Sequence, residues 1–229
     1  MPEDTRGTVT VEIPFLAWTN KAALKIKVSD SLYEQWRLRA AVEIAVKGGA
    51  SLDGASLDGA SLDGASLVGA SLVGASLDGA SLDGASLDGA RLDDARLDGA
   101  SLVCASLVGA SLDGASLDGA RLDGARLDAA RLDGARLDGA SLVGASLDGA
   151  SLVGARLVGA SLDGASGIIC AGFDPGGYRF LGVRHADQWY VAAGFRWFTI
   201  PAAIAHWTAA KNRDALARVG VIQVAAGCA

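Results

Sequence analysis

The sequence predicts a mainly β fold, in which a central coil of short extended segments and corners carries a small α/β module at each end. Between Ala50 and Gly164 the unit Ala-Ser-Leu-Asp-Gly repeats 23 times without a gap, with a Leu at every fifth position from Leu52 to Leu162. Glycine closes nearly every unit, and all 13 aromatic residues lie outside the repeat. A fixed short period of this kind indicates stacked repeats that bury their apolar side chains together.

A period of five fits neither a helix nor a long strand. A helix turns about 100° per residue, so Leu side chains five apart would spread around it, and in a strand they would alternate between faces. A short extended side followed by a corner places Ala and Leu inward, Ser and Asp outward, and Gly where a positive φ is needed. The Leu positions form the predicted core, represented by Leu52, Leu72, Leu92, Leu107, Leu132 and Leu152.

The unit resembles the motif of the pentapeptide-repeat family, which is a small residue, a polar residue, Leu or Phe, and two variable residues. This resemblance covers residues 50–166 and implies a right-handed, four-sided parallel β-helix with four units per turn. The 23 units would then make about 5.75 turns and a rod of roughly 28 Å. The polar slot departs from the family, because it holds Ser or Arg here rather than Asp or Asn. A disordered low-complexity segment is the alternative, and the strictly phased Leu residues argue against it.

Residues 1–49 are predicted to cap the first turn of the coil. Alternating apolar residues predict strands within 8–18 and 23–28. Ser31 and Glu34 match a capping box for a helix that runs to about Lys47 before Gly48-Gly49. Its predicted inner stripe consists of Leu32, Trp36, Ala40 and Ile44. Such a cap is expected because the end of a solenoid exposes apolar core and unpaired strand edges.

Residues 167–229 are predicted to form a second module, beginning where Gly167 replaces the next Leu. After a turn-rich linker, three short strands are expected at 178–183, 189–192 and 195–198. Thr199 and Pro201 indicate a helix to Ala210, and Asn212 indicates the cap of a last helix. The run Gly194-Phe-Arg-Trp-Phe-Thr with His206-Trp207 is similar to C-terminal modules of uncharacterised phage-type proteins, a resemblance that implies no activity.

The sequence offers no pattern that carries chemistry. Cys104, Cys170 and Cys228 are too widely spaced for a disulfide framework or a set of metal ligands. His185, Asp187 and His206 match no catalytic spacing. We therefore expect no catalytic residue, cofactor or metal site, and a protein that is not an enzyme.

The charges are distributed unevenly along the chain. The repeat carries seven Arg and 17 Asp, whereas residues 1–49 have a net charge of +1 and residues 165–229 a net charge of +3. An acidic rod is not expected to bind nucleic acid directly along its length. The chain has neither a visible signal peptide nor an apolar run long enough to cross a bilayer, so we expect a cytoplasmic protein without membrane partners.

Two sets of outward residues are candidate interaction sites. With four units per turn, one side carries an unbroken column of acidic residues, in which neighbouring carboxylates would repel by roughly 1 kcal/mol. Arg96 and Arg136 are expected to soften this repulsion beside Asp98 and Asp138. Val replaces Asp near the end of the repeat, and we expect residues 168–229 to fold back over these apolar side chains. The two sets are Asp58, Asp78, Asp98, Asp118 and Asp138, and Val143, Val153 and Val158.

These features predict a non-catalytic scaffold that presents flat acidic faces to an unidentified protein partner, with a homodimer left open. One alternative comes from the resemblance: the quinolone-resistance group of pentapeptide-repeat proteins mimics duplex DNA and engages type II topoisomerases. The other is an unknown activity in the C-terminal module.

Overall fold

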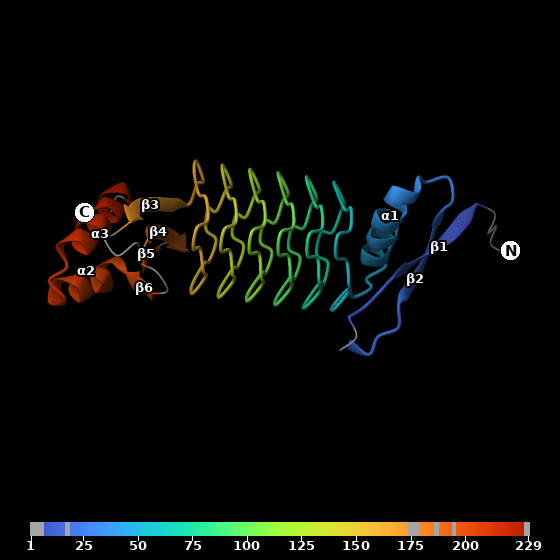
Figure 1. Cartoon of the computed structure of the whole chain (residues 1–229), viewed down its shortest axis with the longest axis horizontal. Coiled ribbons are helices and arrows are strands. Elements are labelled where there is room, and N and C mark those ends of the chain that lie inside the picture. Colours follow the sequence, from blue (N-terminus) through green and yellow to red (C-terminus); the bar gives the residue numbers. More distant parts are fainter. Residues whose placement is uncertain (1–6, 17–18, 174–178, 186–187, 194–195, 227–229) are drawn as a thin grey trace.

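The structure, a computed structural model, describes residues 7–16, 19–173, 179–185, 188–193 and 196–226. The molecule is elongated: a stack of coil turns lies in the middle, with the N-terminal elements at one end and the C-terminal elements at the other (Figure 1). The chain passes through β1 and β2, then helix α1, the repeat, strands β3 to β6, and helices α2 and α3.

The turns of the repeat are joined by parallel bridges between residues that are 20 apart, from Ser56 with Ser76 to Ser146 with Ser166. Four units therefore complete one turn, as the resemblance implied. Hydrogen bonds between turns follow the same register, with Leu97 N–H donating to Ser116 O at 2.7 Å and Ser116 N–H to Ala95 O at 2.9 Å. The peptide groups of each turn are thus satisfied by the turns before and after it.

Each unit ends in a tight corner. In one of them, Ala100 N–H donates to Leu97 O at 3.0 Å, and Gly99 has a φ of +66°. This bond with a positive φ at the third residue is the pattern of a type II turn, which explains the recurring glycine. The three units without glycine keep the same conformation, because Asp94, Cys104 and Ala129 have φ values of 57°, 56° and 56°.

The core of the coil consists of the inward Leu and Ala side chains, as predicted. The six Leu positions named in the sequence analysis are all buried, with exposures of 0% or 1%. Burying one Leu side chain contributes about 1.5–3 kcal/mol before conformational entropy is subtracted, so a continuous Leu column is the main stabilising feature of the rod.

The N-terminal elements close the first turn of the coil. Strands β1 (Thr8–Ile13) and β2 (Leu24–Ser29) form an antiparallel hairpin, and α1 (Glu34–Lys47) packs against it. The chain after β1 pairs with the first turn, where Ser56 N–H donates to Pro14 O at 2.8 Å. From α1, Arg39 donates to Asp63 O at 2.6 Å and Glu43 accepts the Ser66 N–H at 3.0 Å. These bonds occupy part of the edge that the first turn would otherwise expose.

Two expectations about α1 were wrong. The helix begins after Tyr33 with no side-chain cap, and Ser31 instead bonds the Ser29 hydroxyl at 2.6 Å. Its buried face consists of Ala41, Val42 and Ala45, which join the core of the coil. Of the predicted inner stripe, Leu32 and Ala40 pack against the core, whereas Trp36 and Ile44 face outward and are 53% and 46% exposed. Small residues face the rod because Arg39 and Glu43 must come within hydrogen-bond distance of its backbone.

In the part of the C-terminal module that the structure describes, there are four strands rather than the three predicted. Strands β3 (Ile168–Phe173), β4 (Arg179–His185), β5 (Gln188–Ala193) and β6 (Arg196–Thr199) form an antiparallel sheet in that order. The first strand was missed because the glycine-rich stretch at 172–177 indicates a turn, and residues 174–178 lie outside the described residues.

The last two helices begin at the predicted caps. Thr199 accepts the Ala202 N–H before α2 (Ile200–Ala209), and Asn212 accepts the Ala215 N–H before α3 (Arg213–Ala225). The helices enclose a separate apolar core with one side of the sheet, which includes Phe180, Trp207, Val219 and Ile222.

The described residues of the C-terminal module do not fold back over the rod, which corrects a further expectation. It continues beyond the last turn (Figure 1), and the side chains of Val143, Val153 and Val158 are 42%, 43% and 70% exposed. Leu181 and Val183 of β4 instead join the core of the coil, so the sheet covers the end of the Leu column and leaves its sides uncovered.

The corner conformation predicts opposite effects for two reciprocal substitutions. Gly119→Ala should lower the unfolding free energy by about 1 kcal/mol, because a left-handed φ is unfavourable for a residue with a Cβ. A Cβ at Gly119 meets no atom within 4 Å, so a steric clash does not contribute. Ala129→Gly should raise the unfolding free energy by a similar amount. Urea unfolding of both variants tests this, and a loss of stability in both would contradict the assignment of the corner.

Candidate functional site

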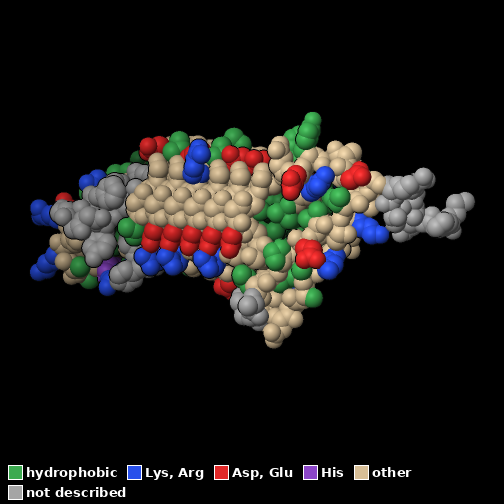
Figure 2. Space-filling model, turned by 45° about the vertical axis from the view of Figure 1, so that its right-hand side comes forward, with side chains coloured by type: hydrophobic (Ala, Val, Ile, Leu, Met, Phe, Trp, Pro, Cys, Tyr) green, Lys and Arg blue, Asp and Glu red, His purple; other side chains and the backbone are tan. Residues whose placement is uncertain are grey.

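The candidate site is the side of the rod that carries the acidic column, here called the column face. It has two parallel rows of residues. The first row is the acidic column itself, and the second stands two residues earlier in each unit and is joined by the bridges between turns. That second row consists of Ser56, Ser76, Arg96, Ser116, Arg136 and Arg156. A view of one side of the rod shows acidic side chains in a row beside basic ones (Figure 2).

The carboxylates of the column bind the backbone of the following turn. Asp98 N–H donates to Asp78 Oδ1 at 3.0 Å, and Asp138 N–H donates to Asp118 Oδ1 at 2.9 Å. The first bond of this series is donated by the Asp78 N–H to the Asp58 carboxylate, and the last by the Val158 N–H to the Asp138 carboxylate. The backbone bonds between turns use the N–H groups of the Leu, Gly and Ser slots, and this side-chain bond serves the Asp slot. The expected repulsion is therefore offset by charge-assisted hydrogen bonds.

The arginines of the column face pair with the preceding turn rather than with the Asp of their own unit. Arg96 pairs with Asp78 and Arg136 pairs with Asp118, whereas Asp98 and Asp138 were the expected partners. Arg156, whose own unit has Val, pairs with Asp138 at 2.7 Å. Within each pair the carboxylate is less exposed than the guanidinium, at 22–23% against 52–61%.

The Asp or Val of the preceding turn determines the partner of each arginine. Arg131 has an Asp at the preceding position and pairs with it, Asp113. The other arginines have Val at that position and pair with the Asp of their own unit at 3.4–3.6 Å. They are Arg91 with Asp93, Arg121 with Asp123, and Arg126 with Asp128. The partner of each arginine can therefore be predicted from the residue 18 positions earlier in the sequence, and not from its own unit alone.

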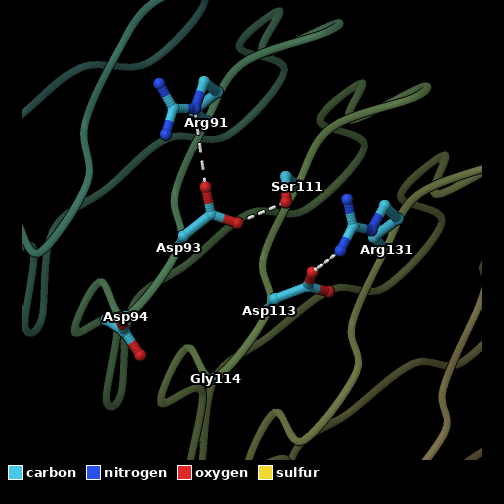
Figure 3. A pocket seen from close by; sticks show the side chains of 7 residues that line it. All are labelled: Arg91, Asp93, Asp94, Ser111, Asp113, Gly114 and Arg131. Carbon is cyan, nitrogen blue, oxygen red and sulfur yellow. Dashed lines mark hydrogen bonds and ion pairs between the residues drawn. The ribbon is translucent and has the colours of Figure 1, made fainter.

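A shallow depression lies on the neighbouring side of the rod (Figure 3). It has a volume of about 630 Å³ and is lined by Arg91, Asp93, Asp94, Ser111, Asp113, Gly114 and Arg131. Asp93 and Asp113 each pair with an arginine, while Asp94 projects from a corner beside Gly114 (Figure 3). The lining carries charge of both signs, and its Ser111 hydroxyl donates to Asp93 as other serines of the rod donate to the Asp of the preceding turn, so the depression offers a polar contact surface.

Outside the rod faces, the described residues also offer few groups that could form a catalytic or metal site. They contain no group of three or more His, Cys, Asp or Glu side chains that could hold a metal ion. Among them, too, no helix has both the length and the apolar character needed to cross a bilayer. The rings of His206 and Phe198 are stacked with their centroids 5.0 Å apart, and His206 Nε2 lies 3.1 Å from Arg196 Nη1. The side chain of His185 and all of Asp187 lie outside the described residues.

Asp53, in the first turn, is held more tightly than a free surface carboxylate. Burial raises its pKa, but hydrogen bonds from Ser71, Ser51 and the Val73 N–H, together with the charge of Lys21, lower it further than burial raises it. The Ser71 hydroxyl lies 2.6 Å and the Val73 N–H 3.0 Å from Asp53 Oδ1. The net result is a pKa below the ordinary value for Asp.

Comparison with protein families matches eight copies of the pentapeptide repeats to residues 50–89, 90–128 and 130–166. A comparison with curated protein sequences finds no match.

Several solved structures are similar to the chain. One is the pentapeptide repeat protein Rfr23 from the cyanobacterium Cyanothece 51142, with 40% identity, 38% of this chain and 58% of that chain covered, and a TM-score of 0.37. A second is a pentapeptide repeat protein from the thylakoid lumen of Arabidopsis thaliana, with 29% identity and a TM-score of 0.31. The match covers 40% of this chain and 61% of that chain. Full-length QnrB1, a plasmid-mediated fluoroquinolone resistance protein, has 16% identity and a TM-score of 0.27. The match covers 48% of this chain and 78% of that chain. The chain thus spans about three fifths of the length of the first two.

The lowered pKa of Asp53 predicts how acid affects stability. Because the folded pKa lies below the unfolded value of about 3.9, the carboxylate stabilises the fold above that pH and loses this contribution as the pH falls through the folded pKa. Asp53→Asn should therefore flatten the loss of unfolding free energy between about pH 5 and pH 2, measured by urea unfolding. The matched control is Asp163→Asn, because Asp163 is exposed in the last turn. Equal slopes for the wild type and Asp53→Asn would contradict the prediction.

Proposed function

Because the chain belongs to the pentapeptide repeat family, we propose that it is a non-catalytic scaffold whose rod presents flat outer faces to a protein partner. In this proposal the 23 units, at four per turn, make one right-handed β-helix of 5.75 turns. The outward carboxylates support a non-catalytic role, because they are engaged by backbone N–H groups, serine hydroxyls and arginines. Such groups hold the coil together and are poorly placed to transfer protons.

The observation that carries the proposal is the apolar band, defined as Val143, Val153 and Val158. All three side chains are exposed, and they replace the Asp that fills most outward slots. They lie on three different sides within the last part of the rod, because their positions differ by 10, 5 and 15 residues in a 20-residue register. A partner that covers them must embrace the end of the rod, and exposed apolar surface of this kind marks contact sites.

Restoring Asp in the apolar band should abolish partner binding and leave the fold intact. The triple variant Val143→Asp, Val153→Asp, Val158→Asp introduces the residue that the repeat itself prefers, so we expect an unchanged thermal melt. Affinity capture from the native host, followed by cross-linking mass spectrometry, should find a protein cross-linked near the band in the wild type. At least a tenfold loss of that protein is expected in the triple variant, since several apolar contacts are replaced by charges.

The matched control is Val68→Asp, because Val68 is 54% exposed but lies in the first turn of the repeat. This variant should capture the partner as the wild type does. Equal capture by the triple variant and the wild type would contradict the role of the apolar band.

DNA mimicry directed at a type II topoisomerase is the second candidate, and the acidic column is the observation that favours it. The charge balance of the column face opposes it, since five Asp stand beside three Arg for a net charge of −2. The other three faces have net charges of −3, −3 and −2. Duplex DNA carries about 16 phosphates over a length of roughly 28 Å, whereas the four faces of the rod together carry a net charge of −10.

This comparison predicts no effect on DNA gyrase. Supercoiling measured by agarose gel mobility should be unchanged at protein concentrations up to about 10 μM, because the rod carries less net charge than DNA of the same length and arginines neutralise part of its column face. Inhibition of supercoiling that is lost in Asp98→Asn, Asp118→Asn would favour the mimic over the scaffold.

A further inference from the structure

The column face has unused capacity for ion pairs. Arg96, Arg136 and Arg156 each contact their Asp through Nη2, although a guanidinium carries five N–H donors. Their side chains are 61%, 52% and 57% exposed. Within the part of the chain that the structure describes, Asp58 and Asp98 have no arginine partner. The face thus offers donors and acceptors in two adjacent rows to any surface with the opposite arrangement.

A second copy of the same face has this arrangement in one orientation only. A twofold axis parallel to the rod exchanges left and right, so that the acidic row of each copy faces the arginine row of the other. An antiparallel pair, related by an axis that runs across the face, places acidic row against acidic row. Because both copies have the same spacing between turns, the contacts repeat along the rod without drifting out of register.

We propose that the column face binds the column face of a second copy, with the two rods parallel. Arg96 of one copy then faces Asp98 of the other, and Arg136 faces Asp138, with each contact made twice by symmetry. Serines of the second row contribute less, because the Ser116 hydroxyl already donates to Asp98 Oδ1 of its own rod at 2.5 Å and Ser76 is buried.

The other faces have fewer arginines and acidic rows that Val interrupts within the rod. The face with the depression has two arginines, and its acidic row is interrupted by Val73 and Val153. Each of the remaining faces has one arginine, Arg121 or Arg126, and a row of Asp interrupted by Val. The column face therefore combines the longest uninterrupted row of Asp with the largest number of arginines, which favours it over the other faces for self-association.

The dimer is expected to be weak and sensitive to salt, because its contacts are exposed ion pairs. Sedimentation equilibrium at about 20 mM salt should detect dimers at roughly 100 μM protein, and the dimer Kd should weaken at least tenfold at about 500 mM salt. A monomer at every salt concentration would overturn the proposal, as would a dimer whose Kd does not change with salt.

Two triple variants with the same change in charge separate the column face from the rest of the rod. Arg96→Ser, Arg136→Ser, Arg156→Ser uses the residue that the unit itself prefers and should abolish the dimer. Arg91→Ser, Arg121→Ser, Arg126→Ser changes the other faces and should leave the Kd within about twofold of the wild type. Thermal melts identify any unfolded variant, and an equal loss of dimer in both folded variants would refute the assignment of the face.

Cross-linking between lysines can show whether the two rods are parallel, because lysines occur only in the two end regions and not in the repeat. Lys47 lies at the N-terminal end of the rod and Lys211 in the C-terminal module, and both are exposed. Cross-linking a mixture of isotopically labelled and unlabelled chains should link Lys47 of one copy to Lys47 of the other. Links between copies from Lys47 to Lys211 would indicate an antiparallel or head-to-tail contact and refute the parallel pair.

This self-association rests on contacts other than those of the partner proposed for the apolar band, although Val158 belongs to both surfaces because it follows Asp138 on the column face. The arginine variants leave the three Val positions unchanged, so loss of the dimer with retention of the captured partner, or the reverse, identifies which of the two proposals fails.

Discussion

The structure depends on one constraint, which is that successive turns pair in a register of 20 residues. Leu, Gly and Ser N–H groups donate to carbonyls 19 or 21 residues away in adjacent turns, and along the acidic column the N–H of the Asp slot binds the Asp carboxylate of the preceding turn. Unpaired peptide groups are costly when they are shielded from water, so the spacing of 20 residues is enforced at every unit. The buried Leu column follows from this register, and so does the alignment of charges on each face.

The sequence was sufficient for the coil because a single short period specifies which side chains point inward and where the chain bends. It was insufficient where several packings were compatible with one pattern. The residues of α1 allow two apolar stripes, and the short side chains of Ala41 and Ala45 prevailed over Trp36 because the helix must approach the backbone of the first turn. The C-terminal strand β3 was missed because its glycine indicates a turn when read locally, whereas its pairing with β4 is a nonlocal contact.

The acidic residues predicted to share one side of the rod do share it in the structure, but the chemistry of their carboxylates differs from the expectation. A column of Asp suggests a strip of bare negative charge, while the structure uses these carboxylates as acceptors for backbone, serine and arginine donors. The partner of each arginine depends on whether the preceding turn has Asp or Val, which no inspection of neighbouring residues reveals. Functional interpretation therefore requires the faces to be read in steps of 20 residues rather than along the chain.

The bridges between residues 20 apart also limit how the length of this rod can change. Adding or removing one five-residue unit would rotate every later unit by a quarter turn, so that the acidic column would continue on a different side. Adding or removing four units would preserve every face and its orientation relative to the modules at the two ends. Duplication in blocks of 20 residues is thus the only change of length that lengthens the rod and leaves the alignment of its surfaces unaltered.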